Sequence, residues 1–308
     1  MRYYKLGNTD LKISKLVFGT WGIGGSVPKS PAYGPVRIEE AITLVNLAIE
    51  KGINLFDTSP AYGNGAAENI LGKVSKTEDI LISTKIGRRN LTDPDKWDLV
   101  SLGKSIRKSL VRLKRNYLDL VFLHSPSEFN TSVYDDVIDF LNGEVKQGNI
   151  RYFGISLKNP KDWTFFSKYD FSAVQMNFNL LDVRSIINFH DLEKKNIGVL
   201  ARGPFASGYL AKDYVELASK LDHRKRWSKD LILKLESLKK KLVNEFNFKS
   251  EDLPELALKF VYSYENIVGI ISTMNSAEEL DFNFEVLNGN HLDLNLRNAI
   301  ASYIFRND

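Results

Sequence analysis

The chain alternates short apolar runs with segments whose apolar residues recur every three or four positions. Eight runs are predicted to be strands, at residues 16–19, 54–57, 80–85, 118–124, 152–156, 173–177, 197–202 and 268–272. Between the first two, apolar residues fall at positions 38, 41, 42, 45, 48 and 49. That spacing is typical of a helix with one buried face.

Further helices are predicted at residues 66–74, 102–113, 133–147, 161–169 and 185–195, each between two predicted strands. Strands that alternate with helices run parallel, and the helices then cover the sheet. We therefore expect an α/β protein built as a single (β/α)8 TIM barrel, with one domain over residues 1–308 and no linker within it.

Three segments lie outside this alternation. Residues 3–14 predict an N-terminal β-hairpin that turns at residues 7–10, where Gly and Asn tolerate the backbone angles of a turn. Residues 26–35 contain three prolines, so a loop above the barrel is expected there. Before the last strand, leucines at 231, 235, 238 and 242 share one face of a predicted helix, and extra helices are expected towards the C-terminus.

Four side chains that handle protons lie at or just past the ends of successive predicted strands. Asp57 and His124 end two strands, Lys85 ends the strand between them, and Tyr62 follows Asp57 in a loop rich in Gly and Pro. The carboxyl ends of the strands of a parallel barrel converge on one face, where catalytic groups collect. The sequence therefore predicts that these four side chains meet.

Each of the four also has a purely structural interpretation. Asp57 alone could cap a helix, Tyr62 could pack in its loop, Lys85 could be a solvated charge at the barrel rim, and His124 could be a core histidine. Their joint occurrence at corresponding strand ends favours a catalytic group over four independent structural roles.

These residues resemble the Asp, Tyr, Lys and His tetrad of the aldo-keto reductase family. Residues 4–21, 56–63, 154–156 and 202–210 are also similar to family motifs, in the family's order, and the resemblance runs from about residue 4 to about residue 290. It implies an NAD(P)H-dependent oxidoreductase that reduces an aldehyde, ketone or sugar carbonyl to the alcohol, or catalyses the reverse.

The resemblance also implies a role for each tetrad residue. No side chain donates hydride, so the nicotinamide cofactor supplies it. Tyr62 would donate the proton, and Lys85 would lower the tyrosine pKa from about 10 as a nearby cation does. Asp57 would hold Lys85, and His124 would hydrogen-bond the carbonyl oxygen.

Cofactor contacts are carried over from the family position by position. Ser156 and Gln175 match the residues that hold the nicotinamide carboxamide, although Leu157 replaces the Asn that often follows that Ser. Arg202 stands where many members stack a Tyr on the nicotinamide; it could stack, face solvent or reach a substrate anion. The remaining expected cofactor contacts are Gly19, Thr20, Trp21, Pro204, Ser207, Gly208, Leu210, Lys212, Asn275, Glu279 and Asn283.

The choice between NAD and NADP is expected to depend on the segment after the last strand. Aligned on Asn283, the chain places Asn275 at a position that is often basic and Glu279 where the family has Gln or Arg. Neither supplies positive charge for a 2′-phosphate, whereas Glu279 could accept hydrogen bonds from ribose hydroxyls. The sequence leans towards NAD or a relaxed preference, unless Glu279 is an ordinary residue of the first turn of a helix.

Composition limits the alternatives. The net charge of +4 comes from 42 basic and 38 acidic residues, which is too balanced to predict nucleic-acid binding. The chain has no cysteine, no secretory signal and no apolar run near the ~20 residues of a membrane span. His190, His223 and His291 lack partners at ligand spacing, so no metal site is expected. We expect a cytoplasmic protein with no membrane or nucleic-acid partner. A monomer is slightly favoured over an oligomer.

Two other functions remain open at this point. One is a nucleotide-sensing regulatory subunit resembling potassium-channel β-subunits, which also retain the tetrad. The other is a lyase or isomerase barrel without a cofactor, which would leave Ser156, Gln175 and residues 203–212 unexplained. The substrate is expected to be set by loops at 22–35, 88–97, 125–131 and 203–230. Candidate wall residues are Trp21, Tyr33 and Trp97, and Arg88 and Arg89 are either rim charges or contacts for an acidic substrate.

Overall fold

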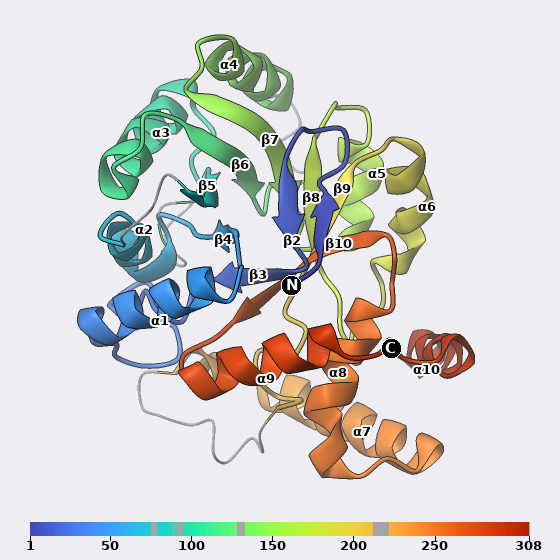
Figure 1. Cartoon of the computed structure of the whole chain (residues 1–308). Helices are drawn as coiled ribbons and strands as arrows, with labels where there is room; N and C mark the ends of the chain where they lie inside the picture. Colours follow the sequence, from blue (N-terminus) through green and yellow to red (C-terminus); the bar gives the residue numbers. More distant parts are fainter. Residues whose placement is uncertain (75–78, 89, 91–94, 128–132, 212–221, 308) are drawn as a thin grey trace.

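The computed structural model describes residues 1–74, 79–88, 90, 95–127, 133–211 and 222–307. Eight parallel strands close a barrel in the order β10-β3-β4-β5-β6-β7-β8-β9 (Figure 1). The barrel strands are β3 (Leu16–Gly19), β4 (Leu55–Asp57), β5 (Leu81–Ile86), β6 (Leu118–His124), β7 (Ile150–Ser156), β8 (Ala173–Asn177), β9 (Gly198–Arg202) and β10 (Ile267–Thr273). The predicted barrel is confirmed.

The N-terminal hairpin closes one end of the barrel. Strands β1 (Tyr3–Lys5) and β2 (Lys12–Ser14) pair antiparallel and lie across the amino ends of the barrel strands (Figure 1). Leu6 and Ile13 pack with barrel residues such as Phe122 in one buried cluster. The turn fits tightly, because Gly7 has a φ of 52° and a Cβ there would lie 2.4 Å from the backbone nitrogen of Gly198. Only a glycine suits both constraints.

Helices follow the strands around the outside of the barrel, and the apolar spacing predicts the first six of them. They are α1 (Ile38–Glu50), α2 (Ala66–Leu71), α3 (Leu99–Leu113), α4 (Tyr134–Lys146), α5 (Trp163–Phe166), α6 (Ile186–Lys194), α8 (Leu253–Tyr262) and α9 (Ala277–Asn288). The helix expected at 161–169 is shorter than predicted. A 3-10 turn at Pro160–Asp162, capped by Asn159, takes its first residues.

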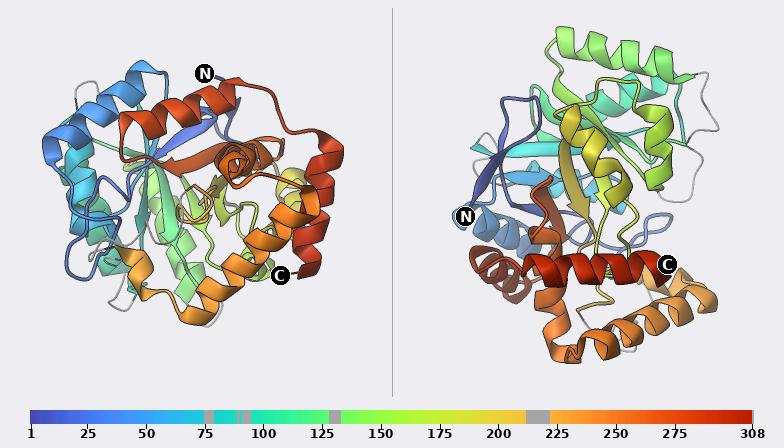
Figure 2. Two further views of the ribbon diagram at one scale, coloured as in Figure 1. Left: turned by 90° about the horizontal axis from the view of Figure 1, so that it is seen from below. Right: turned by 90° about the vertical axis from the view of Figure 1, so that its right-hand side faces the viewer.

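Two helices are additions to the barrel. Helix α7 (Lys229–Phe246) precedes α8, and α10 (Leu294–Asn307) ends the described chain and packs against α7 (Figure 2). The predicted leucine face of α7 is only partly buried: Leu238 and Leu242 are in the core, but Leu231 is 40% exposed. In the described part of the chain, no helix is both long and apolar enough to cross a membrane.

Candidate active site

The four tetrad residues lie together at the carboxyl end of the barrel. Asp57 is the last residue of β4, Lys85 the second to last of β5, and His124 the last of β6. Tyr62 opens the 3-10 helix that follows β4. Parallel pairing of β4, β5 and β6 places their ends side by side, so three strands and one loop bring the four residues into contact.

Lys85 and Asp57 form a buried ion pair beneath the tyrosine ring. Lys85 Nζ donates to Asp57 Oδ2 at 2.6 Å and to the carbonyl oxygen of Thr58 at 2.9 Å. The same ammonium lies 4.9 Å from the centroid of the Tyr62 ring. The cation is therefore held against the phenol, as the sequence predicts.

Asp57 has two further partners that the sequence analysis does not assign to it. Its Oδ1 accepts a hydrogen bond from Ser83 Oγ at 2.8 Å and from Gln175 Nε2 at 2.6 Å. Ser83 precedes Lys85 by two positions, so strand alternation puts both side chains on one face and could have identified it. Gln175 lies 118 positions from Asp57, and only barrel closure brings it near.

Burial and charge set the pKa values of Lys85 and Tyr62. Burial works to lower the pKa of Lys85, but Asp57 and Tyr62 outweigh it and the net pKa is raised. Burial raises the pKa of Tyr62 against the lowering effect of the Lys85 charge. Lys85 thus acts on Tyr62 in the expected direction, but desolvation of the phenol is the larger effect in the protein alone.

His124 is a neutral imidazole in this setting. Burial holds its pKa well below the ordinary value, and the nearby charges of Lys85, Arg88 and Arg202 lower it further. The histidine ring meets the Tyr62 ring edge-on, with centroids 6.3 Å apart. A neutral histidine beside the phenol can give or accept a hydrogen bond without carrying charge.

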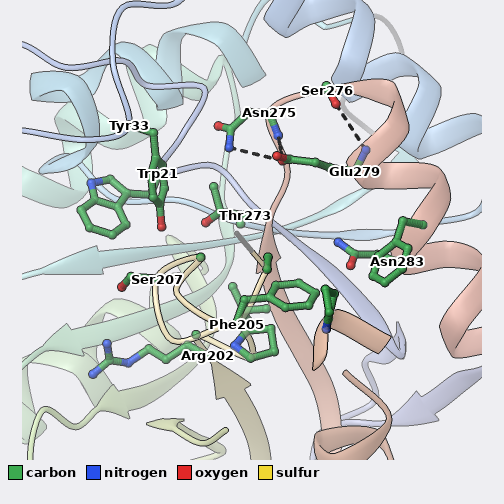
Figure 3. Close-up of a pocket in the computed structure, with 18 of the residues that line it drawn as sticks. Trp21, Tyr33, Arg202, Phe205, Ser207, Thr273, Asn275, Ser276, Glu279 and Asn283 are labelled. Atoms are coloured by element: carbon green, nitrogen blue, oxygen red, sulfur yellow. Dashed lines mark hydrogen bonds between the residues drawn. The ribbon is translucent and has the colours of Figure 1, made fainter. Parts of the chain in front are cut away.

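A cavity of about 740 Å³ extends from Asp57 and Tyr62 to the start of α9. Figure 3 shows Trp21 and Tyr33 on one side, Arg202 and Ser207 below, and Glu279 and Asn283 of α9 on the other side. The expected cofactor residues that line it are Gly19, Trp21, Arg202, Pro204, Ser207, Gly208, Asn275, Glu279 and Asn283. It is long enough to reach from the tetrad to the last barrel helix.

The other expected cofactor residues fall into three groups. Ser156 and Gln175 are buried at the ends of β7 and within β8. Thr20 donates its hydroxyl to the carbonyl oxygen of Asp57 at 3.0 Å and so holds the end of β4. Leu210 is in the hydrophobic core, and Lys212 lies outside the described residues.

The loop after β9 has an unusual backbone. Ala206, Ser207 and Gly208 follow one another with positive φ angles of 48°, 59° and 86°. The carbonyl oxygen of Ser207 accepts a hydrogen bond from Arg224 Nη1 at 3.0 Å, and Arg224 Nε binds Asp222 at 2.8 Å. Sequence reasoning misses Arg224, because it belongs to a basic run at residues 223–226 that looks like surface charge.

Several buried polar atoms at the site have no partner among the described residues. They include the acceptors Gln175 Oε1 and Asn283 Oδ1 and the donors Trp21 Nε1 and Arg202 Nε. Buried polar atoms are normally paired, so unpaired ones beside a cavity point to a polar ligand. The two acceptors, one next to the tetrad and one on α9, fit the amide and amine donors of a nicotinamide adenine dinucleotide.

Glu279 is held by its own helix end. Its Oε2 accepts a hydrogen bond from the backbone nitrogen of Asn275 at 2.8 Å, and Ser276 Oγ caps the Glu279 nitrogen at 3.3 Å (Figure 3). This reciprocal pattern resembles a capping box. The carboxylate still lines the cavity, so the local role and the cofactor role are compatible.

The structure narrows the roles left open for Arg202, and Trp97 differs from its sequence expectation. The Arg202 guanidinium does not extend into solvent: it donates to the carbonyl oxygen of Leu157 at 2.7 Å, and burial lowers its pKa. Trp97 is 8% exposed and packs on the Tyr134 ring at 5.7 Å, so it is a core residue and not a substrate wall. Gly87 leaves room for that indole, since a Cβ there would lie 2.3 Å from it.

Trp21 and Tyr33 form an aromatic wall of the cavity near the tetrad, and the His223 ring packs against both of them. The Trp21 ring centroid lies 5.3 Å from that of Tyr33 and 4.5 Å from that of His223. Arg88 Nε donates to Asp95 Oδ1 at 2.8 Å, which favours the interpretation of Arg88 as a charge at the barrel rim. Arg89 lies outside the described residues. In the described part of the chain, no group of three metal-ligating side chains occurs.

Comparison with known proteins gives consistent results. A sequence model described as the aldo/keto reductase family matches residues 15–300. An uncharacterized oxidoreductase of Bacillus subtilis, YqkF, is 28% identical over 98% of this chain and 96% of its own. L-galactose dehydrogenase of Arabidopsis thaliana is 27% identical over 90% and 85%. The solved holo form of an aldo-keto reductase from Bacillus halodurans superimposes with a TM-score of 0.78, at 23% identity, over 99% of this chain and 96% of that one.

Proposed function

Because the chain belongs to the aldo-keto reductase family and is an NAD(P)H-dependent oxidoreductase of carbonyl compounds, we propose that Tyr62 is its proton donor, assisted by Lys85, Asp57 and His124. The observation that carries the proposal is the buried Lys85–Asp57 ion pair, held 4.9 Å from the Tyr62 ring centroid at the end of the cavity.

The roles follow from the positions of these side chains. A nicotinamide dinucleotide held in this cavity would supply the hydride. The Tyr62 hydroxyl gives its proton to the carbonyl oxygen, which completes the alcohol. Lys85 stabilises the phenolate that remains, and Asp57 keeps the ammonium in place. His124, being neutral, donates a hydrogen bond to the same oxygen. In the reverse direction, Tyr62 accepts the alcohol proton.

The unpaired buried atoms support an assignment of the residues that would hold the dinucleotide. We assign the carboxamide to Ser156 and Gln175, since Gln175 Oε1 is a buried acceptor without a partner among the described residues. The loop at Ser207 and Gly208 faces the middle of the cavity and would meet the phosphates. Asn283 Oδ1 provides a second free acceptor on α9, at the far end.

We further propose that NADH is used at least as well as NADPH. Among the described residues that line the cavity, the only cations are Arg202 and Arg224. Arg202 lies near Tyr62 and Arg224 is paired with Asp222, whereas Glu278 and Glu279 provide carboxylates at α9. A carboxylate repels a 2′-phosphate and accepts hydrogen bonds from ribose hydroxyls.

The substrates are proposed to be small aldehydes, ketones or sugar carbonyls. The wall of Trp21 and Tyr33 offers aromatic surface beside the tetrad, and a sugar dehydrogenase is among the similar proteins. A monomer in the cytoplasm is the favoured form, in keeping with a chain that has no cysteine. Analytical ultracentrifugation at micromolar concentration would show a single 35 kDa species.

Tyr62→Phe tests the proton donor. The substitution removes the hydroxyl and keeps the ring, so turnover should fall about 10²–10⁴-fold, as expected for loss of a general acid. Dinucleotide affinity, followed by protein fluorescence, should stay within about twofold. Tyr3→Phe is the matched control, because it removes only a surface hydrogen bond to the carbonyl oxygen of Gly52. A Tyr62→Phe enzyme with most of its turnover would refute the assignment.

Titration with both reduced dinucleotides tests the cofactor preference. We expect NADH to bind at least as tightly as NADPH, and Glu279→Arg to shift the ratio towards NADPH by about tenfold, roughly 1.4 kcal/mol. Glu285→Arg, on the same helix but outside the cavity lining, separates a specific contact from a general change in charge. Wild-type binding of NADPH about a hundredfold tighter than NADH would contradict the assignment of Asn275 and Glu279.

A further inference from the structure

Ser59 lies between the catalytic strand β4 and Tyr62, in contact with His124. Its side chain is fully buried. Ser59 Oγ is 3.3 Å from His124 Nδ1, and it accepts a hydrogen bond from the backbone nitrogen of Ala61 at 3.1 Å. The Ser59 carbonyl oxygen accepts the Tyr62 N–H at 3.0 Å. One residue therefore touches both groups that would act on the substrate oxygen.

The hydrogen bonds of Ser59 determine which nitrogen of His124 carries the proton. A serine hydroxyl has one proton to donate and two lone pairs. One lone pair takes the N–H of Ala61. If His124 Nδ1 also carried a proton, the Ser59 hydroxyl would have no acceptor among the described residues, and buried donors are rarely left unpaired. Ser59 therefore donates to a bare Nδ1.

The other ring nitrogen must then carry the proton. Because burial and three nearby cations hold the pKa of His124 well below its ordinary value, the ring is neutral and has only one N–H. No described residue forms a hydrogen bond with Nε2. The imidazole stands edge-on to Tyr62, with an angle of 89° between the rings.

We propose that Ser59 is a positioning residue that fixes His124 as the Nε2–H tautomer, so that this nitrogen donates to the carbonyl oxygen protonated by Tyr62. The inference rests on the proposed roles of Tyr62 and His124. The segment 57–59 then serves the whole site: the Asp57 side chain and the Thr58 carbonyl bind Lys85, and Ser59 orients His124.

Nitrogen NMR of protein labelled at histidine tests the proposal directly. The chain has four histidines, and a His124→Gln variant identifies the signals of His124. In the wild type, Nδ1 should appear as an unprotonated nitrogen and Nε2 as protonated. In Ser59→Ala, we expect a shift towards the Nδ1–H tautomer or a mixture. The proposal is overturned if the wild-type proton sits on Nδ1.

Kinetics supply the second measurement. Ser59→Ala should lower kcat about tenfold or more, since a misplaced donor no longer meets the developing negative charge on oxygen. NADH affinity should stay within about twofold, because Ser59 does not line the dinucleotide cavity. Ser59→Thr keeps the hydroxyl and should recover both tautomer and kcat. An Ser59→Ala enzyme that keeps the wild-type tautomer and kcat would also overturn the proposal.

Ser14→Ala is the matched control. Ser14 is equally buried, donates to the carbonyl oxygen of Leu16 at 2.7 Å and accepts from the Asn54 nitrogen at 3.1 Å, but it lies at the other end of the barrel. It should change neither the tautomer nor kcat. The two proposals can fail independently. If Tyr62 is not the proton donor, Tyr62→Phe keeps its turnover, whatever the tautomer of His124. The wild-type spectrum tests the tautomer of His124 even if a variant does not fold.

Discussion

At the scale of single residues, Asp57 is the acceptor on which the site depends. Its carboxylate receives hydrogen bonds from Ser83, Lys85 and Gln175, all buried. An amide side chain at position 57 would offer only one acceptor oxygen. Its NH₂ group would also bring two N–H donors next to the three donors that already surround it. Lys85, in contrast, supplies charge to Tyr62, and its loss leaves Asp57 with two of its three partners.

This asymmetry predicts opposite profiles for two variants. Lys85→Met should lower turnover at least about a hundredfold and shift the remaining activity to higher pH, because the larger of the two cationic effects that oppose the raised pKa of Tyr62 is then lost. Asp57→Asn should lose less turnover, since the cation remains. It should lose more stability, about 3–5 kcal/mol, because the buried Lys85 ammonium then keeps only the Thr58 carbonyl oxygen as an acceptor, whereas in Lys85→Met the Asp57 carboxylate keeps two donors.

Urea unfolding and steady-state kinetics on both variants measure the two effects. A Lys85→Gln variant serves as a second test of the charge, with a polar side chain kept in place. Equal, small losses of turnover in all three variants would mean that the ion pair is only structural.

At the scale of elements, the loop above the barrel is attached to the loop that carries Tyr62. Ser30 Oγ donates to the carbonyl oxygen of Ala61 and accepts the Gly63 N–H at 3.0 Å. These two groups flank Tyr62 in the chain. Asn64 also donates to the carbonyl oxygen of Pro28 at 3.2 Å. The proline-rich loop thus sets the position of the proposed acid from outside.

We therefore expect Ser30→Ala to lower kcat more than it weakens NADH binding. It should also cost about 1–3 kcal/mol of stability, because two buried backbone groups lose their partner. Ser26→Ala is the control in the same loop, where Ser26 Oγ accepts from the nitrogens of Ala32 and Gly34 at 2.9 and 3.1 Å. A drop in kcat as large in Ser26→Ala as in Ser30→Ala would show that the loop acts only as a whole.

At the scale of the whole molecule, the closed end of the barrel contains a buried lysine. Lys15 is 3% exposed, donates to the carbonyl oxygen of Ile267, and lies 5.0 Å and 5.3 Å from the ring centroids of Tyr4 and Tyr262. Burial lowers its pKa from the ordinary 10.5 to about 7, with a further contribution from Arg2. The charge of this group thus links pH to the stability of the fold.

The sign of the pH dependence follows from proton counting. Between pH 7 and 10.5 the unfolded chain holds the Lys15 proton and the folded protein does not, so stability rises with pH. From pH 7 to pH 9 this group should add about 2–3 kcal/mol to the free energy of unfolding. Lys15→Met should remove that rise, measured by urea unfolding at both pH values. Lys12→Met, at an exposed lysine of the same hairpin, should keep it.

Local pattern was enough to predict the barrel and the positions of the tetrad. Strand alternation and helical spacing act within a few residues, so the ends of β4, β5 and β6 could be located, and with them Asp57, Lys85 and His124. The same reasoning missed α8 and overestimated the buried face of α7, because leucine spacing does not say whether a surface lies opposite. The core position of Trp97 was missed as well, because the local sequence of a loop does not say that the ring of Tyr134 lies beside it.

What the tertiary structure alone decided are the partners of those side chains. Gln175 reaches Asp57 across 118 positions, Ser59 meets His124 across 65, and Ser30 meets Gly63 across 33. Barrel closure and loop docking create these contacts, and no local pattern encodes them. The sequence by itself determined which chemical groups stand at the strand ends. Their charge, tautomer and orientation depend on burial and on distant neighbours, which exist only once the barrel is closed.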